Sequence, residues 1–538
     1  MTITKEKVQE ILNKAALRYR GPGGAIAVVQ DGHVIGQRVW GFADLEQRVP
    51  MTSQTQLPIC SITKQFVCAL LIDLERNPTP ALAAKGGVRK QLSDHLTEIL
   101  SPELTRDGEL TLERLCDMQS GMRDYWAMTA LWGSKPDDEF LIARDCGPLL
   151  ARTKSFHFQP GTEFSYCNVN FHVLARVIER ATGESLDKLL EDRILRPAGM
   201  STAFLCPNTA HHPPPCVGYE GTEQHGFTAA VNRMEWSGDA GLVASLTDMI
   251  AYEKYLDHCY ADPQSWYHTA IVPPKFKDGT PAKYRYGLSH TDIDGVNTIG
   301  HGGALRGYRL HRRHAPHERL SVVVMFNSDS DAFGPNIDIF RDLLELPKPV
   351  TASVQATADW VGAFLDQDTQ LSIVITKGAQ DGEVAITYDG SADTIKLSTP
   401  NHGRSNSAVA TVDGDSLSIH RVGDNRILSA RRIAPKESIL RDNSFQGVYH
   451  CTEIESTFHC NGEDGMLYGA FDGYLGQGHA TPMKYLGDDV WVLTCPRGLD
   501  APAPGDWTIV FSRDEHNVIQ GFTIGCWLAR KVDFVKKV

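Results

Sequence analysis

A serine and a lysine lie three positions apart at the start of an apolar run in CSITKQF, residues 60–66. On a helix such residues share one face, so Ser61 and Lys64 would point together from the first turn. Free backbone N–H groups and the helix dipole favour negative charge there. A lysine partly desolvated by apolar neighbours could remove the serine proton and create a nucleophile. An isolated S-x-x-K, however, is more often a capping serine beside an idle lysine.

Two further motifs follow along the chain. Tyr166-Cys-Asn168 lies just before a helical pattern, and His301-Gly-Gly303 lies just before a strand pattern. Tyr166, if two cations stabilised its phenolate, could act as a base and later protonate a leaving group. The Asn168 amide could orient a lysine and a substrate carbonyl, or form an Asx turn. Gly302 and Gly303 would let a strand approach a ligand with no Cβ in the way.

The ordered set SxxK, YxN and HGG resembles the motifs of the penicillin-recognising serine hydrolases, which include D,D-peptidases, class C β-lactamases, and related esterases and D-aminopeptidases. The resemblance covers roughly the first 345 residues. It implies that Ser61 becomes acylated while Lys64 accepts or relays its proton. It also implies an oxyanion hole made by the backbone N–H groups of Ser61 and Ala304.

His301 departs from the family pattern, although we count it among the catalytic residues with Ser61, Lys64 and Tyr166. Relatives that bind a substrate carboxylate usually carry lysine at this position, where a permanent positive charge pairs with the carboxylate. Neutral imidazole is a weaker anchor for an anion. The sequence therefore argues against a substrate with a carboxyl group near the scissile bond.

The composition changes at LELPKPVTASVQATADW, residues 344–360, which is typical of a linker. Strands and helices mix before it, and short alternating segments separated by Asp-Gly turns follow it. DWVGAF and SFQGVY share an aromatic-x-Gly-x-aromatic pattern and indicate two related β-domains. The predicted fold is multidomain α+β: a β-lactamase/D,D-peptidase-like domain with an antiparallel sheet and helices, then two small antiparallel β-barrels. The predicted boundaries are 1–347, 348–440 and 441–538.

The three-part arrangement resembles that of bacterial D-aminopeptidases over nearly the whole chain. In that family a loop of the last domain enters the active site and supplies a carboxylate for the substrate ammonium group. The matching loop is CPRGLDAPAPGDW, residues 495–507, which places Asp500 before the stiffening prolines Pro502 and Pro504.

The resemblance implies a serine aminopeptidase that releases amino-terminal D-residues similar to D-alanine from peptides, amides or esters, through an acyl-enzyme on Ser61. It also implies a homodimer and inhibition by β-lactams. An esterase or a D-amino-acid amidase of the same family is the alternative among enzymes. A non-catalytic peptide sensor is the alternative outside them.

Composition excludes several other classes. The formal charge of −13 without a basic block argues against nucleic-acid binding, and no apolar run is long enough to span a membrane. The amino terminus lacks a signal-peptide pattern, so we expect a cytoplasmic protein with its twelve cysteines reduced. No metal or cofactor is expected, and the histidines near 211–212 and 311–317 are expected at the surface. Residues 75–92 are expected to form an extended loop that lengthens a connection or reshapes the pocket.

Overall fold

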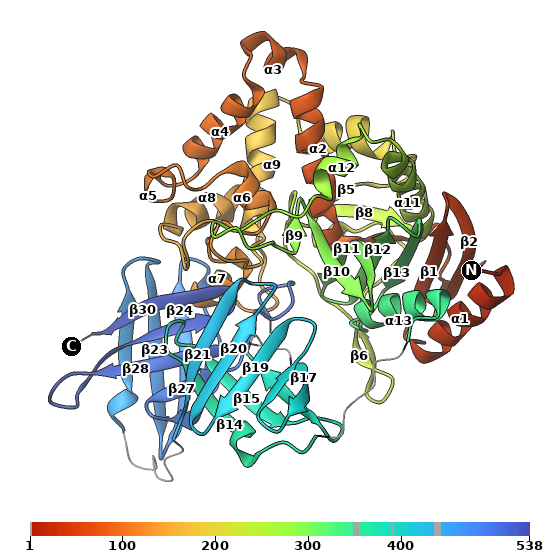
Figure 1. Cartoon of the computed structure of the whole chain (residues 1–538). Coiled ribbons are helices and arrows are strands. Elements are labelled where there is room, and N and C mark those ends of the chain that lie inside the picture. Colours follow the sequence, from red (N-terminus) through yellow and green to blue (C-terminus); the bar gives the residue numbers. More distant parts are fainter. Residues whose placement is uncertain (1–2, 348–353, 389–391, 435–442, 496, 538) are drawn as a thin grey trace.

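The structure is a computed structural model that describes residues 3–347, 354–388, 392–434, 443–495 and 497–537 (Figure 1). An antiparallel sheet of eight strands, in the order β3-β2-β1-β13-β12-β11-β10-β9, forms the centre of the amino-terminal part, and its edge strands are β3 (Val49–Pro50) and β9 (Tyr284–Arg285). The alternating patterns of residues 24–43 and 306–327 predict two hairpins, and both form, as β1 with β2 and as β12 with β13. Asp31 and Gly32 join the first with φ angles of 49° and 72°, which suit a two-residue turn between twisted strands. The strands used below are β1 (Gly23–Gln30), β2 (His33–Asp44), β10 (Leu288–Ile293), β11 (Val296–Leu305), β12 (Tyr308–Ala315) and β13 (Leu320–Phe326).

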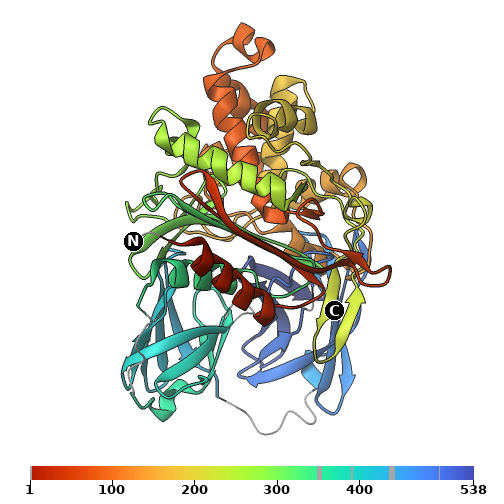
Figure 2. The same cartoon turned by 90° about the vertical axis from the view of Figure 1, so that its right-hand side faces the viewer.

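Helices cover both faces of this sheet (Figures 1 and 2). Helices α1 (Lys5–Arg18) and α13 (Phe333–Leu344) pack on one face, against alternate side chains of β1 and β13. Helices α2 (Thr63–Arg76) and α11 (Leu246–Ala261) lie on the other side, and contribute to the core that contains the remaining β1 and β13 side chains. Burial on both faces explains why LSVVVMF of β13 is apolar at every position except Ser321.

The predicted extended loop over residues 75–92 is wrong. Its residues form α3 (Pro80–Lys85) and the start of α4 (Val88–Ile99), which pack beside α9 (Val169–Thr182). The Thr79 hydroxyl caps α3 by accepting a hydrogen bond from the Leu82 N–H at 3.4 Å. Pro80 occupies the first turn, where proline starts a helix instead of ending one.

The carboxy-terminal part consists of two antiparallel barrels, which confirms the predicted fold class. Strands β14 (Gly362–Asp366) through β21 (Arg426–Arg432) close into an eight-stranded barrel. Strands β22 (Gly447–Cys451) through β30 (Ala529–Lys536) form a nine-stranded sheet that closes through the pairing of β23 (Ser456–Glu463) with β24 (Met466–Gly473). The predicted boundaries at 347/348 and 440/441 lie at residues outside the described ranges, so they stay predictions.

The two barrels begin in the same way. Each opens with a 3-10 turn that buries an aromatic residue, Trp360 in one and Phe445 in the other. The glycine two residues later, Gly362 or Gly447, has a φ of 147° or 141° and starts the first strand. These φ values lie in a region that side-chain-bearing residues rarely adopt, so the shared Gly is required by the backbone. The match supports the predicted duplication.

Three further observations concern the sequence predictions. All twelve cysteines are free thiols, with no disulfide among them. His311 and His314 are buried, because β12 is an inner strand covered on both faces; the prediction of surface histidines is wrong for these two. Within the described part of the chain, no helix has the length and apolarity to cross a bilayer, and no three His, Cys, Asp or Glu residues group as metal ligands.

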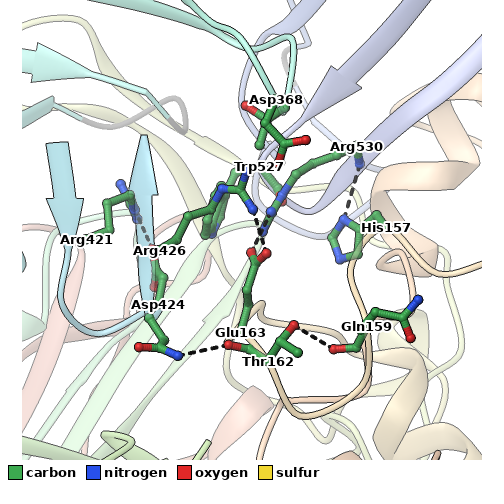
Figure 3. A network of polar contacts seen from close by, with 12 residues as sticks. His157, Gln159, Thr162, Glu163, Asp368, Arg421, Asp424, Arg426, Trp527 and Arg530 are labelled. Atoms are coloured by element: carbon green, nitrogen blue, oxygen red, sulfur yellow. Dashed lines mark hydrogen bonds and ion pairs between the residues drawn. The ribbon is translucent and has the colours of Figure 1, made fainter. Parts of the chain in front are cut away.

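One carboxylate joins all three parts of the chain (Figure 3). Glu163, from the loop before α9, forms ion pairs with Arg426 of the first barrel and, at 2.8 Å, with Arg530 of the second. The Arg530 guanidinium is fully buried and stacks 3.8 Å from the Trp527 ring centroid. Arg123 adds a second connection, because its Nε donates to the Arg530 carbonyl at 2.9 Å. This junction holds the second barrel against the amino-terminal part.

Replacing Glu163 with glutamine keeps the shape of the side chain and removes the charge that pairs with both arginines. A buried arginine left without its partner is destabilising, so we expect Glu163→Gln to lower the free energy of unfolding by about 3 kcal/mol. Thermal unfolding followed by circular dichroism measures the effect as a lower midpoint. Glu10→Gln, which removes an exposed pair with Lys14 on α1, is the control. Equal midpoints for the two variants would contradict a stabilising junction.

Candidate active site

Ser61 lies in a single 3-10 turn, Cys60–Ile62, immediately before α2. The preceding residue, Cys60, is buried and has a φ of 51°, an uncommon angle for a residue with a side chain. Such local strain is often found at active sites, where the surroundings must hold it in place. The turn packs against the end of β11 and presents Ser61 to a cavity of about 520 Å³.

Lys64 points from the first turn of α2 toward Ser61, as the spacing predicts. Its Nζ donates to Ser61 Oγ at 3.0 Å, to Asn168 Oδ1 at 2.9 Å and to the Asp239 carbonyl at 2.6 Å. The side chain is completely buried, and this burial lowers the pKa of Lys64 to about 8 despite the opposing Asp239 and Asp124 carboxylates. An amine with this pKa exists partly in its neutral form near pH 8, and the neutral form can accept a proton.

Asp124, a residue that the sequence did not single out, fixes the Asn168 amide. Asp124 Oδ1 accepts hydrogen bonds from the Asn168 backbone N–H at 2.5 Å and from its Nδ2 at 3.0 Å. The backbone N–H of Asp124 donates at 2.9 Å to the carbonyl of Leu528, in the turn between β29 (Ile519–Cys526) and β30 of the second barrel. A continuous set of hydrogen bonds therefore runs from the last domain through Asp124 and Asn168 to Lys64. In the sequence, Asp124 precedes the helical run YWAMTAL and indicates only an N-cap.

Tyr166 lies beside the nucleophile, with its ring centroid 5.0 Å from Lys64 Nζ. Burial raises the pKa of the Tyr166 hydroxyl well above its usual range, and a hydrogen bond with Ser61 opposes the shift only in part. The Lys64 ammonium is one cation beside this ring, and His301, whose ring centroid lies 6.1 Å from that of Tyr166, is the candidate for a second. The second candidate, His301, is held neutral, because burial and the nearby Lys64 lower its pKa to about 3.

His301 is enclosed by the protein. Its Nδ1 lies 2.6 Å from the Gly302 carbonyl and must donate to it, so that Nε2 accepts from the Tyr284 hydroxyl at 3.0 Å. Both ring nitrogens thus have protein partners, and the imidazole carries no charge for a carboxylate. His301 still lines the cavity, together with Gly302, Gly303 and Ala304.

The glycines after His301 have separate roles. A Cβ at Gly303 would lie 2.3 Å from the Ile59 carbonyl oxygen, so Gly303 permits the nucleophile turn itself to approach β11. A Cβ at Gly302 would meet only His311 and Leu310, at 3.3 Å or more, and the cavity lies over this residue. The pairing of β10 with β11 ends at Gly300, which leaves the edge from His301 to Ala304 uncovered by β10 beside the Ser61 turn.

The loop of residues 495–507 reaches the same cavity. Ala501, Pro502, Ala503 and Pro504 line it, and so do Trp126 and Trp236 of the amino-terminal part. Residue 496 lies outside the described ranges.

Asp500 is buried just behind this wall. Asp500 Oδ2 accepts from Thr209 Oγ1 at 2.9 Å and from the backbone N–H groups of Arg233 and Met234 at 2.7 and 3.0 Å. The other oxygen, Oδ1, is buried without a hydrogen-bond partner among the described residues. Burial raises the pKa of the carboxyl group above its usual value, although these hydrogen bonds oppose the shift. A buried, unsatisfied carboxylate oxygen is unusual and calls for a donor.

The structure thus brings Ser61, Lys64, Tyr166, Asn168 and His301 together at one cavity. The residues that the sequence reasoning missed are Asp124, Asp239 and Leu528, which fix the lysine, and Trp126 and Trp236, which form the apolar wall. In a sequence, a tryptophan indicates a position in the hydrophobic core as readily as a position in a cavity wall. The pattern therefore did not mark Trp126 and Trp236 as site residues.

Comparison with known proteins places this arrangement in a family. The Beta-lactamase family profile matches residues 5–345, and the profile described as "D-aminopeptidase, domain B" matches residues 353–535. The chain resembles the fold of a D-stereospecific amidohydrolase from Streptomyces sp., with 18% identity and a TM-score of 0.50, over 64% of this chain and 99% of that one.

Similarity to whole proteins is stronger. The chain is 40% identical over 516 residues to the D-aminopeptidase of Brucella ovis, covering 96% of both chains. It is 40% identical over 518 residues to the D-aminopeptidase of Brucella anthropi, covering 96% of this chain and 95% of the other. With this identity along nearly the full length and the same order of motifs and domains, the chain belongs to the D-aminopeptidase family of β-lactamase-like serine hydrolases.

Proposed function

We propose that the chain is a serine aminopeptidase that releases amino-terminal D-residues from peptides, amides or esters through an acyl-enzyme on Ser61. The observation that carries the mechanism is the buried Lys64 ammonium, held 3.0 Å from Ser61 Oγ with its pKa lowered to about 8. The D-aminopeptidase relatives support the substrate class.

Lys64 is a better general base than Tyr166 in this site. Its three Nζ protons serve Ser61, Asn168 and the Asp239 carbonyl. When Nζ loses one proton, its two remaining N–H groups still donate hydrogen bonds to Asn168 and to the Asp239 carbonyl. The lone pair of Nζ then faces Ser61. Ser61 Oγ can then transfer its proton to Nζ as it attacks the substrate carbonyl. Tyr166 is protonated at the start of this scheme. As the carbon–nitrogen bond breaks, its hydroxyl donates a proton to the leaving nitrogen and is reprotonated by the Lys64 ammonium, which returns to its neutral form.

The oxyanion formed by this attack would lie between the turn of Ser61 and the uncovered edge of β11. The backbone N–H groups of Ser61 and Ala304 are the proposed donors, since both residues line the cavity. Fixed backbone donors of this kind contribute roughly 2.7–4 kcal/mol each to transition-state stabilisation where they have been measured.

Asp500 is the proposed receptor for the substrate ammonium group. Three donors hold Oδ2 and orient the carboxylate, while Oδ1 has no hydrogen-bond partner among the described residues. An ammonium group supplies the missing donor and neutralises the buried charge. The neighbouring residues 501–504 and the two tryptophans would enclose the D-residue side chain.

Three properties implied by the sequence belong to the same proposal. β-Lactams would acylate Ser61, and the acyl-enzyme would be hydrolysed slowly. The chain would form a homodimer, and it would act in the cytoplasm. Intact mass spectrometry after penicillin treatment tests the first, and light scattering tests the second.

The function is tested by comparing D-alanine p-nitroanilide, its L-enantiomer and the N-acetylated D-compound. We expect hydrolysis of the free D-compound, at least about tenfold slower hydrolysis of the other two, and loss of turnover in Ser61→Ala. Ser53→Ala, at a serine outside the cavity, is the control. Equal rates with the free and acetylated compounds would indicate an esterase or amidase, and absence of both turnover and acylation would indicate a peptide sensor.

Asp500→Asn should separate ammonium binding from loop structure. Asparagine keeps an oxygen for the three donors and puts an NH₂ group where Oδ1 stands, so the loop should stay folded while the ammonium site is lost. We expect kcat/KM for D-alanine p-nitroanilide to fall by about tenfold or more, mainly through KM. An unchanged KM, with a thermal midpoint equal to that of the unsubstituted chain, would remove Asp500 from the site.

The pH dependence of kcat/KM should report the protonation of Lys64. We expect kcat/KM to rise with pH through about 8 as Lys64 loses its proton. The Asp124 carboxylate stabilises the protonated amine and raises its pKa, so Asp124→Asn, which keeps a helix-capping residue, should move this limb to lower pH. Any limb that arises from the substrate amine stays in place in both enzymes.

The pH profile of Asp94→Asn, which removes an exposed carboxylate on α4, should match that of the unsubstituted enzyme. A rising limb at the same pH in Asp124→Asn and Asp94→Asn would mean that Lys64 does not titrate as the base.

A further inference from the structure

A buried arginine without a carboxylate partner lines the far end of the active-site cavity. Arg313 of β12 is 1% exposed, yet its guanidinium contacts only neutral groups within the described residues. Nε donates to Asn336 Oδ1 at 3.1 Å, Nη1 to Thr298 Oγ1 at 2.9 Å and Nη2 to a ring nitrogen of His311 at 3.3 Å. Burial, with the nearby Arg312, lowers the pKa of Arg313 to about 9. A buried charge normally has a partner, because removal from water is costly without one.

The neighbouring arginines show what Arg313 lacks. Arg312, fully buried on the opposite face of the same strand, forms two hydrogen bonds of 2.6 Å with the Glu253 carboxylate. Arg309, which also lines the cavity, pairs with Asp329 at 2.6 Å. Asp331, a carboxylate at the cavity wall, accepts from the first N–H groups of α13 at 2.9 Å. Arg313 is thus the cavity arginine whose charge the described residues leave uncompensated.

His311 adds a second unsatisfied donor. Its Nε2 accepts from Arg313, so the proton of the neutral ring is on Nδ1, which is buried without a hydrogen-bond partner among the described residues. Burial and Arg313 push the pKa of His311 well below its usual range and keep the ring neutral. Phe333, the first residue of α13, covers both groups: its ring centroid lies 5.3 Å from the guanidinium carbon and 5.2 Å from the imidazole. Its side chain is 47% exposed, so it can rotate without opening the core.

Register places these groups on one face of the sheet. Arg313 pairs with Gly300 and His311 pairs with Gly302, so all four residues face the same side. Ser289 of β10 pairs with Gly300 and also lines the cavity there. The two glycines leave this stretch of β11 without side chains, which keeps a path open between Ser61 and Arg313.

We propose that Arg313 and His311 form a subsite for the carboxyl-terminal carboxylate of a short peptide substrate, on the leaving-group side of the scissile bond. The inference rests on the proposed function, because it places the acyl residue against Asp500 and the leaving peptide along β11. A carboxylate supplies the charge that Arg313 lacks and an acceptor for the His311 Nδ1–H.

The strand spacing sets the length of the peptide. Gly300, opposite Arg313, is four residues from the oxyanion donor Ala304, or about 13 Å along the strand at ~3.3 Å per residue. The arginine side chain shortens this span, and each extended peptide residue covers at most ~3.3–3.6 Å. A leaving group of about two or three residues fits, so the favoured substrates are tripeptides and tetrapeptides. This is consistent with neutral His301, which provides no carboxylate anchor beside the scissile bond.

Binding to the Ser61→Ala chain, which cannot turn over its substrate, tests the subsite directly. Calorimetric titration compares D-Ala-L-Ala-L-Ala with the same tripeptide ending in an amide. We expect the free acid to bind about tenfold more tightly or better, and Arg313→Met to bring the ratio of the two affinities close to one. Arg341→Met, which removes an α13 charge paired with Asp294, is the control and should preserve the ratio. Equal binding of acid and amide, or a preference that survives Arg313→Met, would overturn the proposal.

A second measurement uses the unsubstituted enzyme and so does not depend on the folding of any variant. The ratio of kcat/KM for acid over amide should be largest for tripeptides and tetrapeptides and smaller for dipeptides. Turnover of D-alanine p-nitroanilide with no such preference at any length would overturn the subsite and leave the proposed function intact. Absence of all turnover would overturn the proposed function, while the titration would still decide the role of Arg313.

Discussion

The active site depends on keeping a lysine buried without a carboxylate in direct contact. A fully buried amine loses its hydration, and the three acceptors around Nζ are a hydroxyl, an amide oxygen and a backbone carbonyl. A carboxylate in direct contact would favour the charged form and raise the pKa. Here Lys64 Nζ contacts the backbone carbonyl of Asp239 and not its carboxylate, and Asp124 lies beyond Asn168. The charges of Asp239 and Asp124 therefore moderate the lowering of the Lys64 pKa without reversing it. The amine can then accept the proton of Ser61.

This balance explains the involvement of the second barrel. The core of this barrel is continuous with the core of the amino-terminal part, and two segments of the barrel reach the catalytic cavity. The β29–β30 turn contributes Leu528, whose carbonyl fixes Asp124, and the loop at 501–504 forms a wall. The Glu163 ion pairs hold the barrel in the position that both contacts require. Catalytic geometry and domain packing are therefore coupled.

In our proposal, the two charges of a peptide substrate are recognised at opposite ends of the cavity. Behind the wall formed by residues 501–504, Asp500 Oδ1, which has no hydrogen-bond partner among the described residues, is the proposed cation site. At the far end, Arg313 and the His311 Nδ1–H suit an anion. A short peptide with a free amino terminus and a free carboxyl terminus carries both charges at fixed separation, and matching them would orient its first peptide bond over Ser61.

The sequence by itself determined the local chemistry. The S-x-x-K spacing dictates that Ser61 and Lys64 meet, since one helical turn always brings such positions together. Asp31-Gly32 dictates a hairpin, and the Asp-Gly turns after the linker dictate β-domains. The prediction for residues 75–92 was wrong because the local pattern Thr79-Pro80 is typical of the end of a helix. The same pair is also typical of the start of a helix, which it forms here.

Only the tertiary structure decided the electrostatics. The pKa of a lysine or histidine depends on the groups that surround it, and those around Lys64 come from positions 61, 168 and 239, far apart in the chain. The burial of His311 and His314 follows from the position of β12 inside the sheet, which pattern alone did not reveal. Asp124 and Arg313 were missed for the same reason: a carboxylate at a helix start and an arginine in a strand acquire their roles from partners, or from the lack of a partner, that only folding brings into place.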